Sequence, residues 1–390
     1  MTPATPLATP TATWAPGGDL TPAVTWAGQH DGAVPLAGGA ALIAGGADAG
    51  SAPQSRAALL DPANGNWNAT GSLHTPRRLH SLTLLGDGRV LAAGGTSAGP
   101  QFPTPALAGA EVYDPGTKIW TDTAGAMHTA RWGHSAVLLD NGTVLVAGGS
   151  AVRSAQSVGA VRSAELFNPA NGQWTETAPM TDARTGHVAV VLGDGKVLVI
   201  GGSVPVGRTD EAQLAFCELY DPDTHEWTPT GSLLVPRSHH QAVLLSPTSV
   251  LVTGGSPPGP DGSADGSFDP FSRASTERYD AATGQWTAAK PMPSGRHRHR
   301  AVALSDGRAV VIGGADDIRD GAGFAGTLLY DGDDWVPVGG LTTGRWGFAA
   351  TVLTDGRVLA VGGVARSGQA TAAGTGLELT ATTELLTESA

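Results

Sequence analysis

The sequence predicts an all-β fold in which seven four-stranded sheets close into a ring, a seven-bladed β-propeller. Three observations predict it. A stretch that begins at Arg131 and reads R-W-G-H-S-A-V-L-L-D-N-G-T-V-L-V-A-G-G recurs along the chain, always with an arginine 17 residues before a glycine pair. Tryptophans recur at steps of 49 to 59 residues. The 56 glycines and the short apolar runs favour strands and tight turns. Self-similarity at this period indicates one closed array, although 390 residues would otherwise suggest two or three domains.

The repeat occurs six times with its arginine and once without it. The six arginines are Arg77, Arg131, Arg184, Arg237, Arg296 and Arg345. In the seventh copy, which reaches the pair Gly45-Gly46, Gly28 stands in the place of the arginine. The regularly spaced tryptophans are Trp14, Trp67, Trp120, Trp174, Trp227, Trp286 and Trp335.

Each repeat is predicted to form four strands, which we name a to d. Strand a is the H-S-A-V-L-L run, and strand b is the V-L-V-A-G-G run. A D-G or N-G dipeptide between them, such as Asp87-Gly88, predicts a two-residue hairpin turn. A loop of variable length leads to strand c, for example residues 164–167, and a short D-P turn leads to strand d, which opens with the tryptophan.

The two ends of the chain predict how the ring closes. Residues 11–14 resemble a strand d with no strand a, b or c before it, and the last repeat has a plausible strand c at 383–386 but no tryptophan after it. We therefore expect the N-terminal strand to complete the C-terminal blade, which would remove the free sheet edges. Residues 1–10, rich in Thr, Pro and Ala, are expected to be a disordered tail, and residues 11–390 a single propeller.

Composition limits the classes of function. The chain has 35 acidic and 23 basic residues, a formal net charge of -12, which disfavours general nucleic-acid binding. Its one cysteine, Cys217, allows no intrachain disulfide and lies in a strand-like run, where we interpret it as a small buried hydrophobe. The first residues do not resemble a secretory signal, and no stretch approaches a membrane span. A cytoplasmic location, with neither membrane nor nucleic acid as partner, is the expectation.

The four-strand unit resembles the kelch repeat in its glycine pair, in the spacing of Tyr113 and Trp120, and in the sevenfold count. The resemblance covers nearly the whole chain. It implies that ligands and partners meet the face formed by the d–a and b–c connections. The fold also resembles the kelch domain of galactose oxidase, whose copper chemistry needs a tyrosine crosslinked to a cysteine together with tyrosine and histidine ligands. The four tyrosines of this chain all occupy the position of Tyr113 in strand c, so this copper site does not carry over and no cofactor is expected.

Tryptophans and histidines that depart from the repeat gather at the d–a connections. Trp132 and Trp346 directly follow a repeat arginine, and Trp26 and His30 flank the glycine that replaces it. Repeats five and six deviate most, reading R-S-H-H and R-H-R-H-R from their arginines. Neighbouring arginines depress the pKa of a histidine, so a neutral imidazole could act there as a base near pH 7.

These departures give the candidate site. The candidate catalytic residues are His239, His297, His299 and Asp31. The candidate substrate-binding residues are the arginines Arg77, Arg131, Arg184, Arg237, Arg296 and Arg345, together with Trp26, Trp132, Trp346 and His30. We expect no metal, because close arginines oppose a cation at these histidines. A loop from Asp261 to Asp269 begins like a calcium site, but Ser272 stands where such a loop needs its bidentate ligand.

Each assignment has a structural alternative. The five histidines three residues after the arginine, His299 among them, can bond the backbone of a neighbouring blade. The arginines can pair with carboxylates of strand c, namely Glu111, Glu165, Glu218 and Glu277. The extra tryptophans can fill the core.

Two functions are compatible with the sequence. The first is a small-molecule enzyme that performs non-redox acid–base chemistry, such as isomerisation, cyclisation or elimination, on an anionic and partly aromatic or apolar substrate at the d–a/b–c face. The second is a binding module that recognises an acidic peptide or protein at the same face.

Overall fold

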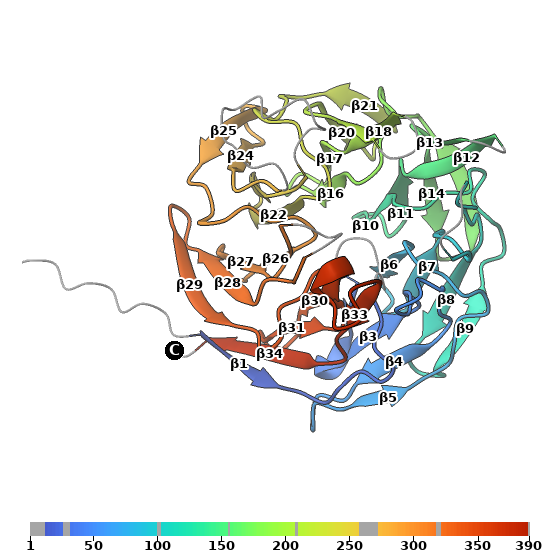
Figure 1. Cartoon of the computed structure of the whole chain (residues 1–390). Helices are drawn as coiled ribbons and strands as arrows, with labels where there is room; N and C mark the ends of the chain where they lie inside the picture. The colour runs from blue at the N-terminus through green and yellow to red at the C-terminus, as the bar shows by residue number, and fades with distance from the viewer. Residues whose placement is uncertain are drawn as a thin grey trace, which may run out of the picture.

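The computed structural model describes residues 12–25, 32–99, 103–154, 157–206, 210–256, 272–316 and 321–388. Seven antiparallel four-stranded sheets lie around a common centre, which confirms the seven-bladed propeller (Figure 1). Within each sheet the strands follow the order a-b-c-d, with strand a nearest the centre of the ring. We number the blades 1 to 7 in chain order of their strands a.

The blades share this strand order, and their bounds are as follows. Strands a are β2 (Val34–Pro35), β6 (Ser81–Leu84), β10 (Ser135–Leu138), β16 (Val188–Val191), β22 (Gln241–Ser246), β26 (Arg300–Ala303) and β30 (Ala349–Val352). Strands b are β3 (Ala41–Ala44), β7 (Val90–Ala93), β11 (Val144–Ala147), β17 (Val197–Ile200), β23 (Ser249–Thr253), β27 (Ala309–Ile312) and β31 (Val358–Val361). Strands c are β4 (Ala57–Leu60), β8 (Ala110–Asp114), β14 (Ala164–Asn168), β20 (Cys217–Asp221), β24 (Thr276–Asp280), β28 (Gly326–Tyr330) and β34 (Thr383–Glu388). Strands d are β5 (Trp67–Ala69), β9 (Ile119–Asp122), β15 (Gln173–Thr177), β21 (Glu226–Pro229), β25 (Gln285–Ala289), β29 (Trp335–Gly340) and β1 (Ala12–Pro16).

The N-terminal strand closes the ring, as the sequence predicts. β1 pairs antiparallel with β34, and Trp14 lies opposite Leu386. Blade 7 therefore takes its strand d from the start of the chain and its other strands from the end, which satisfies the edge that β34 would otherwise expose.

The a–b turns differ from the two-residue hairpins expected from the D-G and N-G dipeptides. In blade 2 the Leu85 N–H donates to the Arg89 carbonyl, and the Gly88 N–H donates back to the Leu85 carbonyl. Gly88 has φ +87°, so the loop is a three-residue turn whose last residue is left-handed. The Asp87 carboxylate accepts the Arg89 N–H, which confirms that this turn aspartate satisfies the backbone.

The glycine pair and the histidine after the arginine form one joint between blades. His134 of blade 3 lies against Gly94 of blade 2, where an added Cβ would sit 2.8 Å from its Cε1 atom. A Cβ added at Gly149 of blade 3 would sit 2.9 Å from the Cβ of the same histidine. Its Nε2 bonds Ser81 Oγ of blade 2 at 3.0 Å. His134 therefore has a structural role between blades, but the partner of its Nε2 is a side chain and not the neighbouring backbone that the sequence analysis predicted. Glycine is needed at these positions because a side chain would collide with the histidine.

Apolar side chains fill the space between neighbouring blades. The strand-c aromatic packs on the strand-d tryptophan, as in Tyr113 and Trp120, whose ring centroids lie 5.1 Å apart at 43°. Cys217 is fully buried in the core between blades 4 and 5, and burial raises the pKa of its thiol to about 11. The interpretation of Cys217 as a buried hydrophobe is therefore confirmed. Among the described residues, no helix has the length and apolarity to cross a bilayer.

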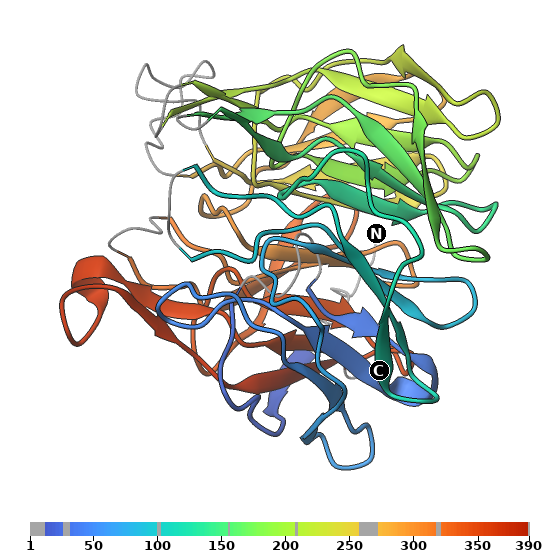
Figure 2. The same ribbon diagram turned by 90° about the vertical axis from the view of Figure 1, so that its right-hand side faces the viewer.

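Three of the b–c connections form two-stranded hairpins. These are β12 (Ser150–Ser154) with β13 (Ser157–Ala160), β18 (Ser203–Val206) with β19 (Asp210–Gln213), and β32 (Val364–Ser367) with β33 (Leu377–Leu379). Two 3-10 turns, η1 (Ala37–Gly39) and η2 (Gly368–Ala370), complete the described elements. Figure 2 shows β32 and β33, in red, projecting beyond the blades on one side of the ring.

Candidate ligand site at the centre of the propeller

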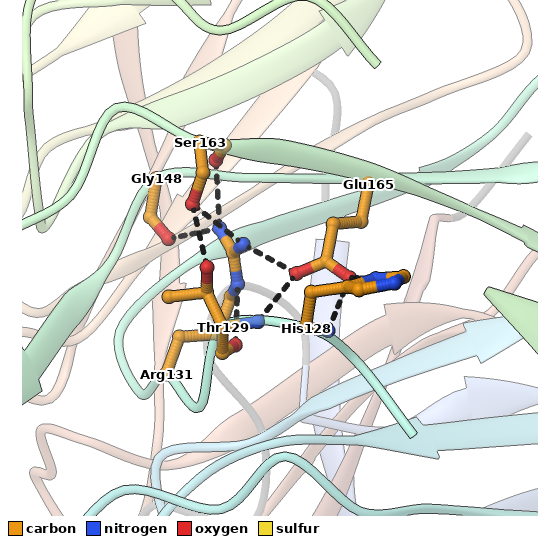
Figure 3. Close-up of polar contacts among 6 residues, drawn as sticks. All are labelled: His128, Thr129, Arg131, Gly148, Ser163 and Glu165. Carbon is orange, nitrogen blue, oxygen red and sulfur yellow. Dashed lines mark hydrogen bonds and ion pairs between the residues drawn. The ribbon is translucent and has the colours of Figure 1, made fainter. Parts of the chain in front are cut away.

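Most of the repeat arginines are enclosed in ion pairs, as Arg131 of blade 3 shows (Figure 3). One guanidinium nitrogen, NH1, donates to the carbonyls of Gly148 and Ser163, both at 2.8 Å. The other, NH2, lies 2.8 Å from Glu165 Oε1, and both side chains are fully buried. The backbone N–H groups of His128 and Thr129 donate to Glu165 Oε2 and Oε1 at 2.6 and 3.0 Å.

The electrostatics of this cluster favour the ionised pair. Burial lowers the pKa of Arg131, and Glu165 opposes that effect. Burial alone would raise the pKa of Glu165, but the N–H groups of His128 and Thr129 and the charge of Arg131 outweigh it, and the net shift is downward.

The same ion pair recurs in five blades. The pairs are Arg77–Glu111, Arg131–Glu165, Arg184–Glu218, Arg237–Glu277 and Arg345–Glu384. This confirms the predicted pairing with strand c and adds Glu384, which the sequence analysis missed. In the other four blades the glutamate stands two residues before the strand-c residue that lies opposite the tryptophan. In blade 7 that residue is Leu386, opposite Trp14, so the same rule would have located Glu384. Because these guanidinium groups are enclosed, we give the five arginines a structural role and do not place them in the ligand site.

Arg296 of blade 6 is the exception. Its NH1 donates to the carbonyls of Gly313 and Gly326, in the manner of Arg131, but Leu328 stands at the strand-c position of the glutamate. Among the described residues, no carboxylate forms an ion pair with it. Burial lowers the pKa of Arg296 to about 10.

A ring of backbone hydrogen bonds surrounds the centre of the propeller where strands a begin. It joins the residues two positions after the repeat arginine. Five N–H groups, those of Gly133, Gly186, His239, Arg298 and Gly347, each donate to the carbonyl of the equivalent residue in the preceding blade, with N···O distances of 2.9 to 3.4 Å. The series begins at Leu79, whose carbonyl accepts the first of these bonds. All six residues have φ between +51° and +66°. Three are glycine, but Leu79, His239 and Arg298 adopt this left-handed conformation with a side chain, which is uncommon.

His239 and Arg298 are neighbours in this ring, and His297 directly precedes Arg298. The Arg298 N–H donates to the His239 carbonyl, and His239 is half-buried with its Nδ1 bonded to Ser238 Oγ at 3.1 Å. His297 Nδ1 lies 3.1 Å from the hydroxyl of Ser256, which bridges Ser238 through the backbone. The structure therefore brings two of the predicted catalytic histidines beside an arginine that the sequence analysis did not name.

His299 occupies a different environment. It is fully buried, and its Nε2 lies 2.8 Å from Thr253 Oγ1 of blade 5. Burial and the nearby charge of Arg296 hold its pKa well below the usual range. His299 is thus the interblade joint of blade 6, and we do not carry it into the ligand site. Three further candidates, Trp26, His30 and Asp31, lie outside the described residues.

The two described extra tryptophans differ in exposure. Trp346 is buried and packs with Ala315 and Val364 at the base of the β32–β33 hairpin, which agrees with the core-filling alternative. Trp132 is half-buried at the start of β12, bridged to Ser150. Of the two, Trp132 is the one placed to present part of its ring to a ligand.

Metal-ligand atoms converge at one place within the described residues. His74, Glu111 and Asp122 have ligand atoms within 4.8 Å of one another. Glu111 and Asp122 lie opposite each other on β8 and β9, a pairing that strand register alone could have indicated. Glu111 is already paired with Arg77 at 2.7 Å, and that charge opposes a cation. The calcium-like loop from Asp261 to Asp269 lies outside the described residues.

A pocket of about 490 Å³ opens on the opposite face, between blades 6 and 7. Leu304, Val310, Val352 and Leu386 line it, with the a–b turns of both blades. Leu386 occupies the strand-c position that carries an aromatic ring in blades 2 to 6, so less volume fills this interface.

Comparison with known proteins places the chain in a family. A model of the KLHDC2/KLHL20/DRC7 Kelch-repeats domain matches residues 30–255 and, in an overlapping match, 110–314. The chain belongs to the kelch-repeat family. This kelch propeller is 29% identical over 194 residues to Kelch-like protein 34 of Homo sapiens, covering 50% of the chain and 28% of that protein. It is 28% identical over 255 residues to Kelch-like protein terF of Aspergillus terreus (strain NIH 2624 / FGSC A1156), covering 64% and 51%.

The chain thus spans between about a quarter and a half of these curated relatives. Two solved structures share its fold. One is described as a novel fungal alcohol oxidase with catalytic diversity among the AA5 family, in complex with copper, with TM-score 0.68, 17% identity, and coverage of 96% of this chain and 76% of that one. The other is YjhT, with TM-score 0.57, 18% identity, and coverage of 79% and 95%. Identities this low establish the fold alone.

Proposed function

We propose that this kelch propeller binds a small organic anion at the centre of the d–a/b–c face, and that His239 moves a proton on it in a non-redox reaction such as isomerisation, cyclisation or elimination. The observation that carries the proposal is the left-handed backbone of His239. The equivalent residues of blades 3, 4 and 7 are glycines, which adopt φ near +60° without strain. A histidine costs about 1 kcal/mol or more in this conformation. Such strain is commonly found where a side chain must be aimed for function.

The surroundings of His239 support a role in acid–base chemistry. Ser238 Oγ engages Nδ1 and fixes the orientation of the imidazole. The ring lies on Gly186, where an added Cβ would be 3.2 Å from Nε2. Arg298, next in the ring, brings a positive charge suited to a carboxylate or phosphate. His297 and the half-buried Trp132 would complete the site as a second polar group and an apolar surface.

The test is a thermal-shift titration against small carboxylates, phosphates and aromatic acids, on the wild type and on His239→Asn. Asparagine tolerates the left-handed conformation, so this change removes the imidazole with little effect on the backbone. The matched control is His225→Asn, because His225 also has a positive φ, +59°, but lies exposed in a c–d turn on the opposite face. We expect stabilisation by an organic acid that His239→Asn loses and His225→Asn keeps. Equal responses in all three proteins would overturn the proposal.

A binding module for an acidic peptide or protein is the second candidate. The hairpins β12–β13, β18–β19 and β32–β33 all arise from b–c connections and so widen the face around the centre. A wide rim favours a macromolecular ligand. An acidic peptide that binds with micromolar affinity, while no small acid stabilises the protein, would favour this candidate over the enzyme.

A further inference from the structure

Blade 6 keeps the repeat arginine but lacks the carboxylate that five other blades place beside it. Leu328 pairs with Val311 in the register in which Glu165 pairs with Val146 in blade 3. Its side chain packs in the core between blades 5 and 6 with Val311 and Met292. Since leucine offers no charge, Arg296 must meet its requirement for a counter-ion in another way.

The guanidinium of Arg296 is nevertheless held as in the other blades. NH1 donates to Gly313 O at 3.0 Å and to Gly326 O at 3.2 Å, which fixes the plane and direction of the group. NH2 has one partner among the described residues, Ser294 Oγ at 3.3 Å, whereas the carboxylates of the other blades lie 2.6 to 3.0 Å from it. NH2, which forms the buried ion pair in five other blades, therefore makes, within the described part of blade 6, only a long hydrogen bond to a neutral hydroxyl.

The backbone N–H groups that donate to the glutamate in the other blades also differ in blade 6, in a way that matches the loss of the carboxylate. In blade 3, Glu165 Oε1 receives Arg131 NH2 and the N–H of Thr129, two residues before the arginine. The equivalent of Thr129 is Ser294, an exposed residue that keeps both the backbone N–H and a side-chain hydroxyl. Glu165 Oε2 receives the N–H of His128, and its equivalent Pro293 has no N–H to give.

Blade 6 thus retains the donors for one anionic atom and has lost the donor for a second. The cation is also costly to bury alone, because desolvation of an unpaired charge is not repaid by neutral groups. The ring of Phe324, 5.5 Å from the guanidinium carbon, offsets part of that cost.

We propose that Arg296 and Ser294 bind a small exogenous anion, a halide ion or one oxygen of a small carboxylate, in the place that the Glu165 carboxylate takes in blade 3. The exposed Pro293 and Ser294 give it access from solvent. The site is separate from the centre of the face, yet it anchors the connection that leads directly into His297 and Arg298.

Thermal unfolding at constant ionic strength tests this site, with sodium chloride and sodium formate compared with sodium gluconate, whose anion is too large to enter. The wild type should unfold about 2 °C or more higher in chloride or formate. Leu328→Glu, which supplies an internal carboxylate, should lose that difference, while the apolar control Leu328→Ile, which brings no oxygen to the site, should keep it. Equal unfolding temperatures of the wild type in the three salts, or a difference that Leu328→Glu retains in full, would overturn the proposal.

A second measurement is independent of any variant. Crystals of the wild type soaked in sodium bromide should give an anomalous peak within hydrogen-bond distance of Arg296 NH2 and Ser294 N. The corresponding position in blade 3, which Glu165 fills, serves as the internal control and should give none. No peak at Arg296 would overturn the proposal even if the salts differ in the unfolding experiment.

Discussion

Blades 3 and 6 hold the same arginine in the same backbone contacts, but they balance its charge differently. In both, NH1 bridges a glycine-pair carbonyl and a carbonyl before or at the start of strand c. Only blade 3 adds a buried carboxylate, Glu165. The comparison teaches that the arginine is placed by its bonds to carbonyls, which tie the d–a connection to two strands of the blade. The position of the guanidinium therefore does not depend on a neighbouring glutamate that neutralises its charge.

The largest expected effect separates the two arginines. Arg131→Met should destabilise the protein by about 3–5 kcal/mol, because it leaves the buried carboxylate of Glu165 without its cation. Arg296→Met should cost at least about 2 kcal/mol less, because no carboxylate is left behind in blade 6. Denaturant unfolding of both variants and the wild type under identical conditions measures the difference. Equal losses would mean that the carbonyl bonds, and not the ion pair, carry the energy in both blades.

A second prediction concerns the interblade histidine, which blade 2 carries as His80 and blade 7 replaces with Phe348. Burial, aided by the charge of Arg77, lowers the pKa of His80 from 6.5 to about 3. Between these values the unfolded chain binds a proton that the folded chain does not, so stability falls as the pH drops from 6.5 towards 3, by about 1.4 kcal/mol per pH unit.

His80→Phe should reduce this dependence, because phenylalanine fills the same position in blade 7 against Gly313 and Gly363. Unfolding midpoints measured from pH 7 to pH 4 provide the check, and the wild type is the reference. A variant as acid-sensitive as the wild type would place the titrating group elsewhere.

The smallest expected effect concerns the ring at the centre of the face. His239→Gly should stabilise the fold by up to about 1 kcal/mol, because glycine relieves the left-handed strain as it does at Gly133 and Gly186. Leu79→Gly is the matched control at an equivalent position outside the histidine pair, although the loss of its side chain offsets part of the gain. A marked loss of stability in His239→Gly would show that the imidazole serves packing, and would weaken its proposed role with a ligand.

The sequence by itself determined the ring of seven blades and its closure by β1, because a fixed period of strands and turns has one way to bury its apolar faces. It also determined the partners of most arginines, since a glutamate stands two residues before the aromatic residue of strand c in blades 2 to 5. The tertiary structure decided the turn geometry and the left-handed backbone at His239 and Arg298. Those φ values follow from hydrogen bonds between blades, which local spacing does not encode. The structure was also needed to recognise the environment of Arg296. The sequence contains Leu328 at that position, but only the fold shows that the guanidinium keeps its bond to the Gly313 carbonyl while leucine replaces the glutamate.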